Sequence, residues 1–143
     1  MKTLNLKETG ASKEDSVILL EMFIESARLE KETIVKVLHG YGSHGKGGVL
    51  FSAIREKLAS MKRHKKIKDF FGGGKWNLLD NETVSALLKD KSCFDDDLNK
   101  SNPGITIIIL WVIFAQIAQE IVILIEKSNL VFVRLDQKLL WQK

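Results

Sequence analysis

Hydrophobic positions along the chain follow two different periodicities. Apolar residues recur at helical spacing between Ser12 and about Lys31, and this predicts an amphipathic helix with Ser12 as its N-cap and Asp15 completing a partial capping box. Residues 33–38 contain a short β-branched run and predict a strand that stops at His39. Residues 50–61 again show helical spacing, with an apolar inner face and charged residues outside.

Weaker patterns complete the list of expected elements. Residues 3–6, 66–71 and 105–110 predict strands, and residues 81–89 predict a short helix capped by Asn81. The order strand, helix, strand, loop, helix is typical of an α/β (α+β) domain. We therefore expect one such domain over residues 1–110.

The last 33 residues, 111–143, form an apolar extension that we expect to be helical. The 21 residues from Ile105 to Ile125 approach the length of a membrane span, but Gln116, Gln119 and Glu120 interrupt them. The polar residues recur near helical spacing, which favours an interaction helix over a span. Such a helix could cover a sheet edge, form a dimer seam or lie on a membrane surface.

Composition narrows the possibilities. The 143 residues are 45% hydrophobic and 28% charged, which suits one domain core. A lone Cys93 excludes an intramolecular disulfide framework and, without clustered histidines, identifies no metal site. The first residues contain no apolar stretch of the kind found in a secretory signal, so we expect a cytoplasmic protein.

Charge is distributed unevenly although the net charge is only +4. Residues 40–75 contain nine basic side chains and only two acidic ones. The acidic run Asp95 to Asp97 offsets much of this positive charge in another part of the sequence. Charge segregation of this kind favours a polyanionic partner, and a solvated Lys-rich helix end is the alternative.

The segment between the second strand and the second helix is rich in glycine. Five glycines stand between Gly40 and Gly48, and the loop leads into a helix N-terminus, where free N–H groups attract anions. Lys46 adds a positive charge, while His39 and His44 can transfer protons near neutral pH. A phosphate group is the ligand that this pattern predicts.

Gly40 to Lys46 also fits the first seven positions of the Walker A pattern. Gly47 then stands where a Ser or Thr should hold Mg²⁺, and no later strand ends in an obvious magnesium-binding Asp, so nucleotide hydrolysis is disfavoured. A purely structural glycine-rich turn remains an alternative.

Three segments together carry a family resemblance. They are the His39-Gly40-Tyr41-Gly42 motif after the second strand, the following helix with Ile54-Arg55, and the final strand with Asn102 to Ile107. They resemble the small MutS-related (Smr) domain, in particular small stand-alone bacterial Smr proteins. The resemblance covers residues 1–110. It implies a two-layer β-α-β-α-β-β sandwich like the C-terminal domain of translation initiation factor three, with nucleic-acid binding or endonuclease activity.

On that pattern His39, Gly40, Gly42 and Gly45 would meet a backbone phosphate, and His39 would be the best candidate for proton transfer. The chain departs from the family at its N-terminus. Many Smr domains open with a Leu-Asp-Leu-His/Arg-Gly motif, whereas here Asn5 replaces the acid, and Asn cannot serve as a general base. Binding is therefore better supported than catalysis.

The sequence thus predicts a domain that binds DNA or RNA, with endonuclease activity as a further hypothesis. The catalytic candidates are His39 and, more weakly, His44. The residues expected to contact nucleic acid lie in the loop and along the basic helix, and they are Gly40, Gly42, Gly45, Lys46, Gly47, Arg55, Lys62, Arg63, Lys65 and Lys66. No cofactor or protein metal ligand is identified, and use of a divalent metal stays open. The alternative function is a membrane-surface or oligomeric interaction protein that acts through Trp111 to Lys143.

Overall fold

The computed structural model describes residues 1–42, 48–111 and 121–127. Residues 1–111 form one compact unit, and residues 112–143 are assigned to a second one. Residues 121–127 of the second unit are helical, and the rest of the extension, including Gln116 to Glu120, lies outside the described residues. No described helix is long and apolar enough to cross a membrane. The domain boundary at residue 110 and the role of the extension stay predictions.

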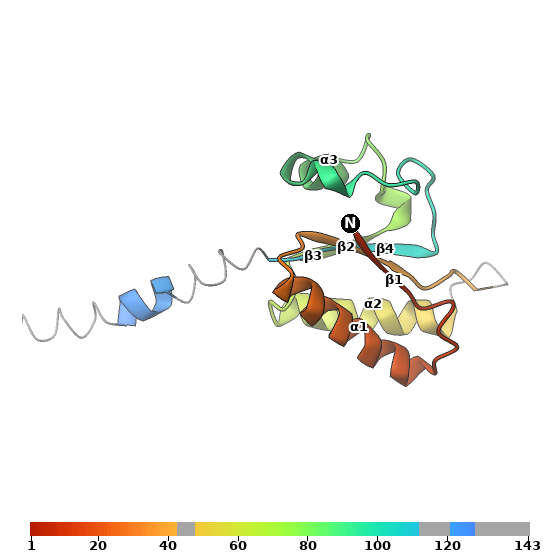
Figure 1. The fold of residues 1–143 in the computed structure, drawn as a ribbon, viewed down its shortest axis with the longest axis horizontal. Coiled ribbons are helices and arrows are strands. Elements are labelled where there is room, and N and C mark those ends of the chain that lie inside the picture. The colour runs from red at the N-terminus through yellow and green to blue at the C-terminus, as the bar shows by residue number, and fades with distance from the viewer. Residues whose placement is uncertain (43–47, 112–120, 128–143) are drawn as a thin grey trace, which may run out of the picture. The chain divides into compact units, whose positions relative to one another are not determined.

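The first unit is a mixed α+β domain, and its order of elements agrees with the sequence prediction (Figure 1). The elements are β1 (Lys2–Asn5), α1 (Lys13–Leu29), β2 (Ile34–Leu38), α2 (Val49–Arg63), β3 (Asp69–Gly72), the 3₁₀ turn η1 (Gly73–Lys75), α3 (Asn81–Lys89), the 3₁₀ turn η2 (Lys91–Cys93) and β4 (Ile105–Ile109). Ser12 caps α1 as predicted, since its hydroxyl accepts from the Asp15 N–H at 3.0 Å.

One predicted boundary and one predicted helix cap were wrong. The third strand begins at Asp69 and not at Lys66, because the chain leaves α2 through Lys65 in a left-handed conformation, with φ of 56°, and the Lys66 N–H bonds back to Met61 at 2.8 Å. Helix α3 is capped by Asp80 and not by Asn81. The Asp80 side chain accepts from the N–H groups of the second and third helical residues, Glu82 and Thr83, which is the usual capping geometry.

The four strands form one sheet in the order β1-β2-β4-β3. β1 and β2 are parallel, while β4 is antiparallel to both β2 and β3. In this register Leu38 lies opposite both Asn5 and Ile105, and Gly72 lies opposite Thr106. The ends of β1, β2 and β3 therefore meet the start of β4 at one end of the sheet, which is the end where the Gly-rich loop begins.

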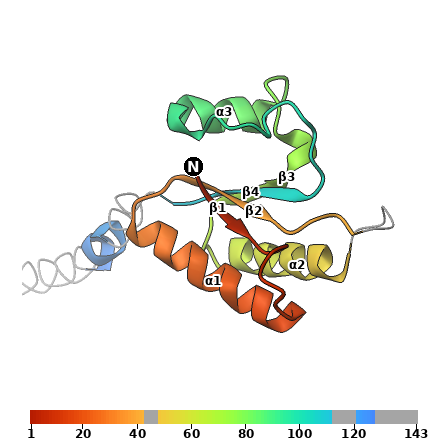
Figure 2. The same cartoon turned by 45° about the vertical axis from the view of Figure 1, so that its right-hand side comes forward.

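Helices cover both faces of the sheet. Figures 1 and 2 show α1 and α2 on one face and α3 on the other. Val35 and Val37 of β2 pack in the core under α1 and α2, whereas Ile34 packs with Trp76 and other residues of a second core under α3. The α+β fold and the four-stranded sheet are thus confirmed, but the predicted two layers become three because α3 adds a layer of its own.

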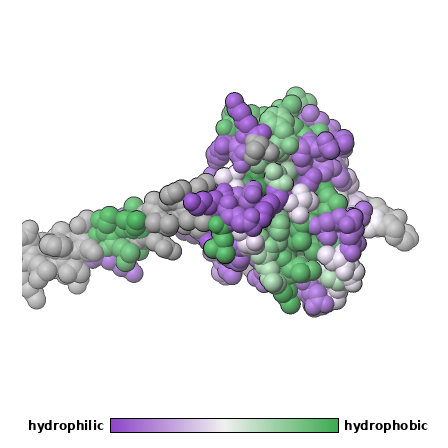
Figure 3. All heavy atoms as spheres, in the orientation of Figure 1, coloured by the Kyte–Doolittle hydropathy of each residue, from purple (hydrophilic) through white to green (hydrophobic). Residues whose placement is uncertain are grey.

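The outer surface of the α1 and α2 layer carries apolar atoms. Figure 3 shows hydrophobic atoms over this layer, and Ile18 and Met22 of α1 are exposed. Cys93 and Trp76 are both buried and belong to the second core, under α3.

Candidate functional site

His39 follows directly after β2 and lies inside the domain, with 5% of its surface exposed. Its Nδ1 lies 2.6 Å from the Gly40 carbonyl oxygen, and its Nε2 lies 2.8 Å from the Thr106 hydroxyl. Because a carbonyl can only accept, Nδ1 carries the proton, and Nε2 accepts from the Thr106 hydroxyl. Both ring nitrogens are therefore used within the protein, and His39 fastens the start of the Gly-rich loop to β4.

The surroundings of His39 keep its ring neutral. Burial lowers the pKa of His39 below its ordinary value, the backbone hydrogen bonds at Gly40 and Ile105 oppose the shift, and the nearby Arg55 guanidinium adds to it. A neutral ring has one N–H, which agrees with one donated and one accepted hydrogen bond. A proton transfer by His39 would require Nε2 to leave Thr106.

Two glycines give the loop its first turn. Gly40 and Gly42 have φ of 72° and 81°, a left-handed conformation that glycine adopts without strain. The N–H groups of His39 and Gly40 both donate to the Gly104 carbonyl at 3.0 Å. A Cβ at Gly104 would lie 3.3 Å from the Gly40 Cα, so the Asn-Pro-Gly segment packs closely against the His-Gly motif.

A buried ion-pair network holds the segment before β4. Lys36 in β2 is 8% exposed, and its Nζ donates to Asp95 and Asp97 at 2.6 Å each. Asp97 also accepts from the Asn102 side chain at 3.1 Å, and Asn102 in turn accepts from the Gly104 N–H at 2.9 Å. These contacts connect the sheet to the carbonyl that positions His39. No local signal in the sequence pairs the acidic run Asp95 to Asp97 with Lys36, so this role was not predicted.

The other end of the Gly-rich loop is the N-terminus of α2. Gly48 caps this helix without a side-chain hydrogen bond, and the first turn contains no acidic residue. A Cβ on Gly48 would lie 3.7 Å from the Gly42 Cα, so the two ends of the loop are close together. A helix N-terminus of this kind attracts anions. The predicted loop residues His44, Gly45, Lys46 and Gly47 lie outside the described residues.

An aromatic and cationic row runs along α2 from the loop. The Phe51 ring makes edge contacts with His39 and Tyr41, at centroid distances of 5.3 and 5.6 Å. The Arg55 guanidinium lies 5.6 Å from the Phe51 centroid and 5.2 Å from that of Phe70. Arg55 thus lies close to the start of the loop, and its contact with a nucleic-acid backbone stays a prediction. Phe51 and Phe70 were not predicted, although the helical spacing of Phe51 and Arg55 would have paired them.

The remaining predicted basic residues lie at the far end of α2. Lys62, Arg63, Lys65 and Lys66 are all exposed there. A helix of 15 residues is about 22 Å long, so these side chains cannot bind the same phosphate as the loop. Phosphates of one strand in a duplex are spaced about 3.4 Å along the axis, so this length corresponds to about six of them. The loop and the basic helix end therefore lie about one helix length apart.

Comparison with known proteins adds the family. Residues 6–74, which include the His-Gly turn, Arg55 and β3, match the sequence model of the Smr domain. The chain belongs to the Smr domain family. A solved structure, the Smr domain of Thermus thermophilus MutS2, is similar at 20% sequence identity and a TM-score of 0.49, over 78% of this chain and 99% of that one. No curated protein matches the chain.

The N-terminal strand of this Smr domain brings two further residues to the site. Asn5 lies at the end of β1, and its side-chain oxygen accepts from the Lys7 N–H at 3.2 Å. The Lys7 side chain passes 3.5 Å from the position of a Cβ on Gly40. Lys7 therefore lies beside the His-Gly turn and adds a cation that the predicted site did not include.

Metal ligands do not gather at this site. Within residues 1–42, 48–111 and 121–127, no three His, Cys, Asp or Glu side chains are placed so that they could hold one ion together.

Proposed function

We propose that this Smr domain binds nucleic acid through backbone phosphates, with the Gly-rich loop and the N-terminus of α2 at one end and the basic end of α2 at the other. The observation that carries the proposal is the position of the turn at Gly40. The N–H groups of His39 and Gly40 hold this turn on the Gly104 carbonyl, beside the N-terminus of α2, whose first turn contains no acidic residue. Membership of a family of nucleic-acid-binding, nicking-endonuclease-type domains supports it. Contacts of this kind read little sequence, so we expect weak sequence preference.

Salt-titrated binding to labelled RNA and DNA oligonucleotides tests the proposal. The double variant Lys65→Gln/Lys66→Gln should weaken binding at every sequence and reduce the salt slope by about two, because each lysine that contacts a phosphate contributes about one. Lys13→Gln, which changes an exposed lysine at the start of α1, serves as the matched control and should bind like the unsubstituted protein. Absence of binding even at low salt would end the proposal.

Endonuclease activity is the second candidate, and family membership favours it. In the structure His39 uses both ring nitrogens, and Asn5 takes the place of the family's acid, so the described geometry supports binding more directly than cleavage. Labelled RNA and DNA incubated with and without a divalent metal will report retention and cleavage together.

If His39 transfers a proton, His39→Ala should abolish cleavage. Binding should stay largely intact, because the backbone N–H groups of His39 and Gly40 still donate to the Gly104 carbonyl. Thr106→Val is the matched variant, because it removes the hydroxyl partner of Nε2 and leaves the ring in place. Full cleavage by the His39→Ala protein would remove His39 from the mechanism.

A further inference from the structure

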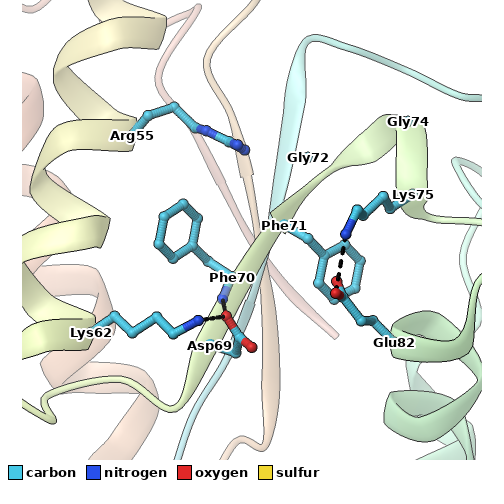
Figure 4. Close-up of a pocket in the computed structure, with 9 residues that line it drawn as sticks. All are labelled: Arg55, Lys62, Asp69, Phe70, Phe71, Gly72, Gly74, Lys75 and Glu82. Carbon is cyan, nitrogen blue, oxygen red and sulfur yellow. Dashed lines mark hydrogen bonds and ion pairs between the residues drawn. The ribbon is translucent and has the colours of Figure 1, made fainter.

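A groove of about 420 Å³ runs beside the outer edge of β3. β3 is an edge strand of the sheet, and Figure 4 shows the groove between α2 on one side and η1 with α3 on the other. Its lining comes from four elements and consists of Arg55, Lys62, Asp69, Phe70, Phe71, Gly72, Gly74, Lys75 and Glu82. None of the binding residues predicted from sequence lies on the α3 side of this groove.

Two of the three cations that line the groove are paired with carboxylates. Lys62 lies 2.6 Å from Asp69, and Lys75 lies 3.0 Å from Glu82. Arg55 makes no ion pair with a carboxylate of the described residues. Arg55 is therefore the groove cation that can take an anion without losing a carboxylate partner, whereas Lys75 would exchange Glu82, its half-exposed partner, for a phosphate.

The Arg55 side chain is already oriented for such a contact. It lies over the rings of Phe51 and Phe70, and its Nη1 would be 3.3 Å from a Cβ on Gly72. Figure 4 shows it pointing toward the Gly72 end of the groove, away from the pair of Lys62 and Asp69. A planar guanidinium held in this way loses little conformational freedom when it binds a phosphate.

The groove also gives access to the backbone of β3. The Phe70 N–H donates to its neighbouring Asp69 side chain at 2.8 Å and so faces the free edge. Gly72 and Gly74 present no side chain there, and a Cβ on Gly74 would meet nothing within 4 Å. A flexible strand could therefore approach this edge closely.

The Arg55 end of the groove is also the end nearest the loop. Gly72 lies opposite Thr106, whose hydroxyl bonds to His39. A nucleic-acid strand that leaves the loop therefore meets Arg55 before it meets the carboxylates of Asp69 and Glu82.

We propose that this groove is a subsite for one unpaired nucleotide of a single-stranded nucleic acid, with its phosphate at Arg55 and its base toward Asp69 and Glu82. The proposal rests on the proposed function and adds the substrate class and Lys75 as a contact. The volume falls within the range of small-molecule pockets and suits one nucleotide, whereas a duplex is too wide to enter. The carboxylates repel a phosphate but accept hydrogen bonds from base amino groups.

Fluorescence anisotropy with a labelled single strand and a duplex of equal length tests this subsite. Arg55→Lys keeps the charge but loses the planar fork, and it should weaken single-strand binding about tenfold and duplex binding by a clearly smaller factor. Lys75→Gln should weaken single-strand binding about threefold and lower its salt slope by about one. The matched control is Lys91→Gln, an exposed lysine outside the groove, which should bind like the unsubstituted protein.

A photo-crosslink gives a second readout that does not depend on any variant. Trypsin cleaves after Lys68 and Lys75, so the tryptic peptide of residues 69–75 contains Phe70 and Phe71. An oligonucleotide with one 4-thiouridine or 4-thiothymidine should crosslink to this peptide when it is single-stranded and not when it is in a duplex.

The outcomes separate the two proposals. If the unsubstituted protein binds but both groove variants match Lys91→Gln, or lose single-strand and duplex binding equally, the groove is not the subsite. A crosslink confined to residues outside 69–75 leads to the same conclusion. If the unsubstituted protein binds neither nucleic acid at low salt, the proposed function itself fails, and the subsite with it.

Discussion

The most informative test of the architecture is the substitution Lys36→Met. It removes the cation at the centre of the network that joins β2 to Asp95 and Asp97, and through Asn102 to the Gly104 carbonyl. Met has a similar length and no charge, so the change leaves two carboxylates without their shared partner. The domain should unfold more easily, and the His-Gly turn should be held less firmly.

The size of the effect follows from burial. Removing one partner of a fully buried ion pair costs about 3–5 kcal/mol. Here the side chains of Asp95 and Asp97 keep 17% and 22% of their exposure, and they retain hydrogen bonds from Trp76 and Asn102. We therefore expect a loss of about 2–3 kcal/mol. For a unit of this size that loss lowers Tm by about 8–12 °C.

The dependence on pH has a definite sign. The hydrogen bond from Lys36, followed by that from Asn102, lowers the pKa of Asp97, so its contribution is present above the unfolded pKa of about 3.9 and is lost as pH falls through the folded value. Burial alone would lower the pKa of Lys36, but the hydrogen bonds to Asp95 and Asp97 outweigh it and raise the pKa. That contribution is lost only as pH rises above about 10.

The assay is chemical and thermal unfolding of the full chain at pH 3, 5 and 7. The matched control is Lys62→Met, which breaks a pair whose side chains are 49% and 44% exposed and should cost about 0–1 kcal/mol. The excess instability of the Lys36→Met protein should become smaller as pH falls from 5 to 3, because protonation of Asp97 removes a charge that Lys36 stabilises. A Tm loss no larger than that of the control would refute the reasoning.

Three further predictions follow from the same structure. Gly73→Ala would place a Cβ 2.1 Å from the Asn102 carbonyl oxygen and should destabilise the domain by about 1–3 kcal/mol in urea unfolding. Gly74→Ala, whose Cβ would meet nothing within 4 Å, should change stability by less than about 0.5 kcal/mol. Equal effects of the two substitutions would contradict the packing described around Gly73. Because the pKa of His39 is lowered, its neutral ring contributes stability that is complete above about pH 6.5 and is lost as pH falls through the folded value. His39→Gln should therefore reduce the change in the urea midpoint between pH 7 and pH 5. A change as large as that of the unsubstituted protein would count against a neutral, buried ring. Deletion of residues 112–143 should leave nucleic-acid binding intact while changing oligomer size or liposome association if the extension is an interaction helix; loss of nucleic-acid binding would instead place the extension in the interface.

Much of the fold could be predicted from sequence because it is encoded locally. Helix α1 has its cap and its apolar spacing within one segment, and β4 is a β-branched run whose burial on both faces fits the three layers that the structure shows. The motif around His39 and the match of residues 6–74 to the Smr domain are likewise properties of the sequence. The bounds of α3 were predicted correctly, but its cap and the start of β3 were not. The end of one helix and the cap of the next depend on hydrogen bonds that composition does not reveal.

The chemistry of the site was decided by tertiary contacts. His39 is a plausible acid or base by residue type, but the approach of Thr106 and the Gly40 carbonyl occupies both of its nitrogens. Lys36 belongs to a strand pattern, and only the return of the chain over β2 places two carboxylates on it, 59 and 61 residues away.

The sequence by itself therefore determined the elements, the family and the presence of a glycine-rich loop near basic residues. Helix geometry, which the sequence also predicts, places Arg55 nearer to that loop than Lys65 and Lys66, which follow the far end of α2. The tertiary structure alone placed Lys7 beside the turn at Gly40. It also brought the edge of β3, with Lys75 on the α3 side, next to Arg55. The physical reason is that spacing along one helix is fixed by its rise per residue, whereas contacts across a sheet edge depend on how distant segments pair and pack.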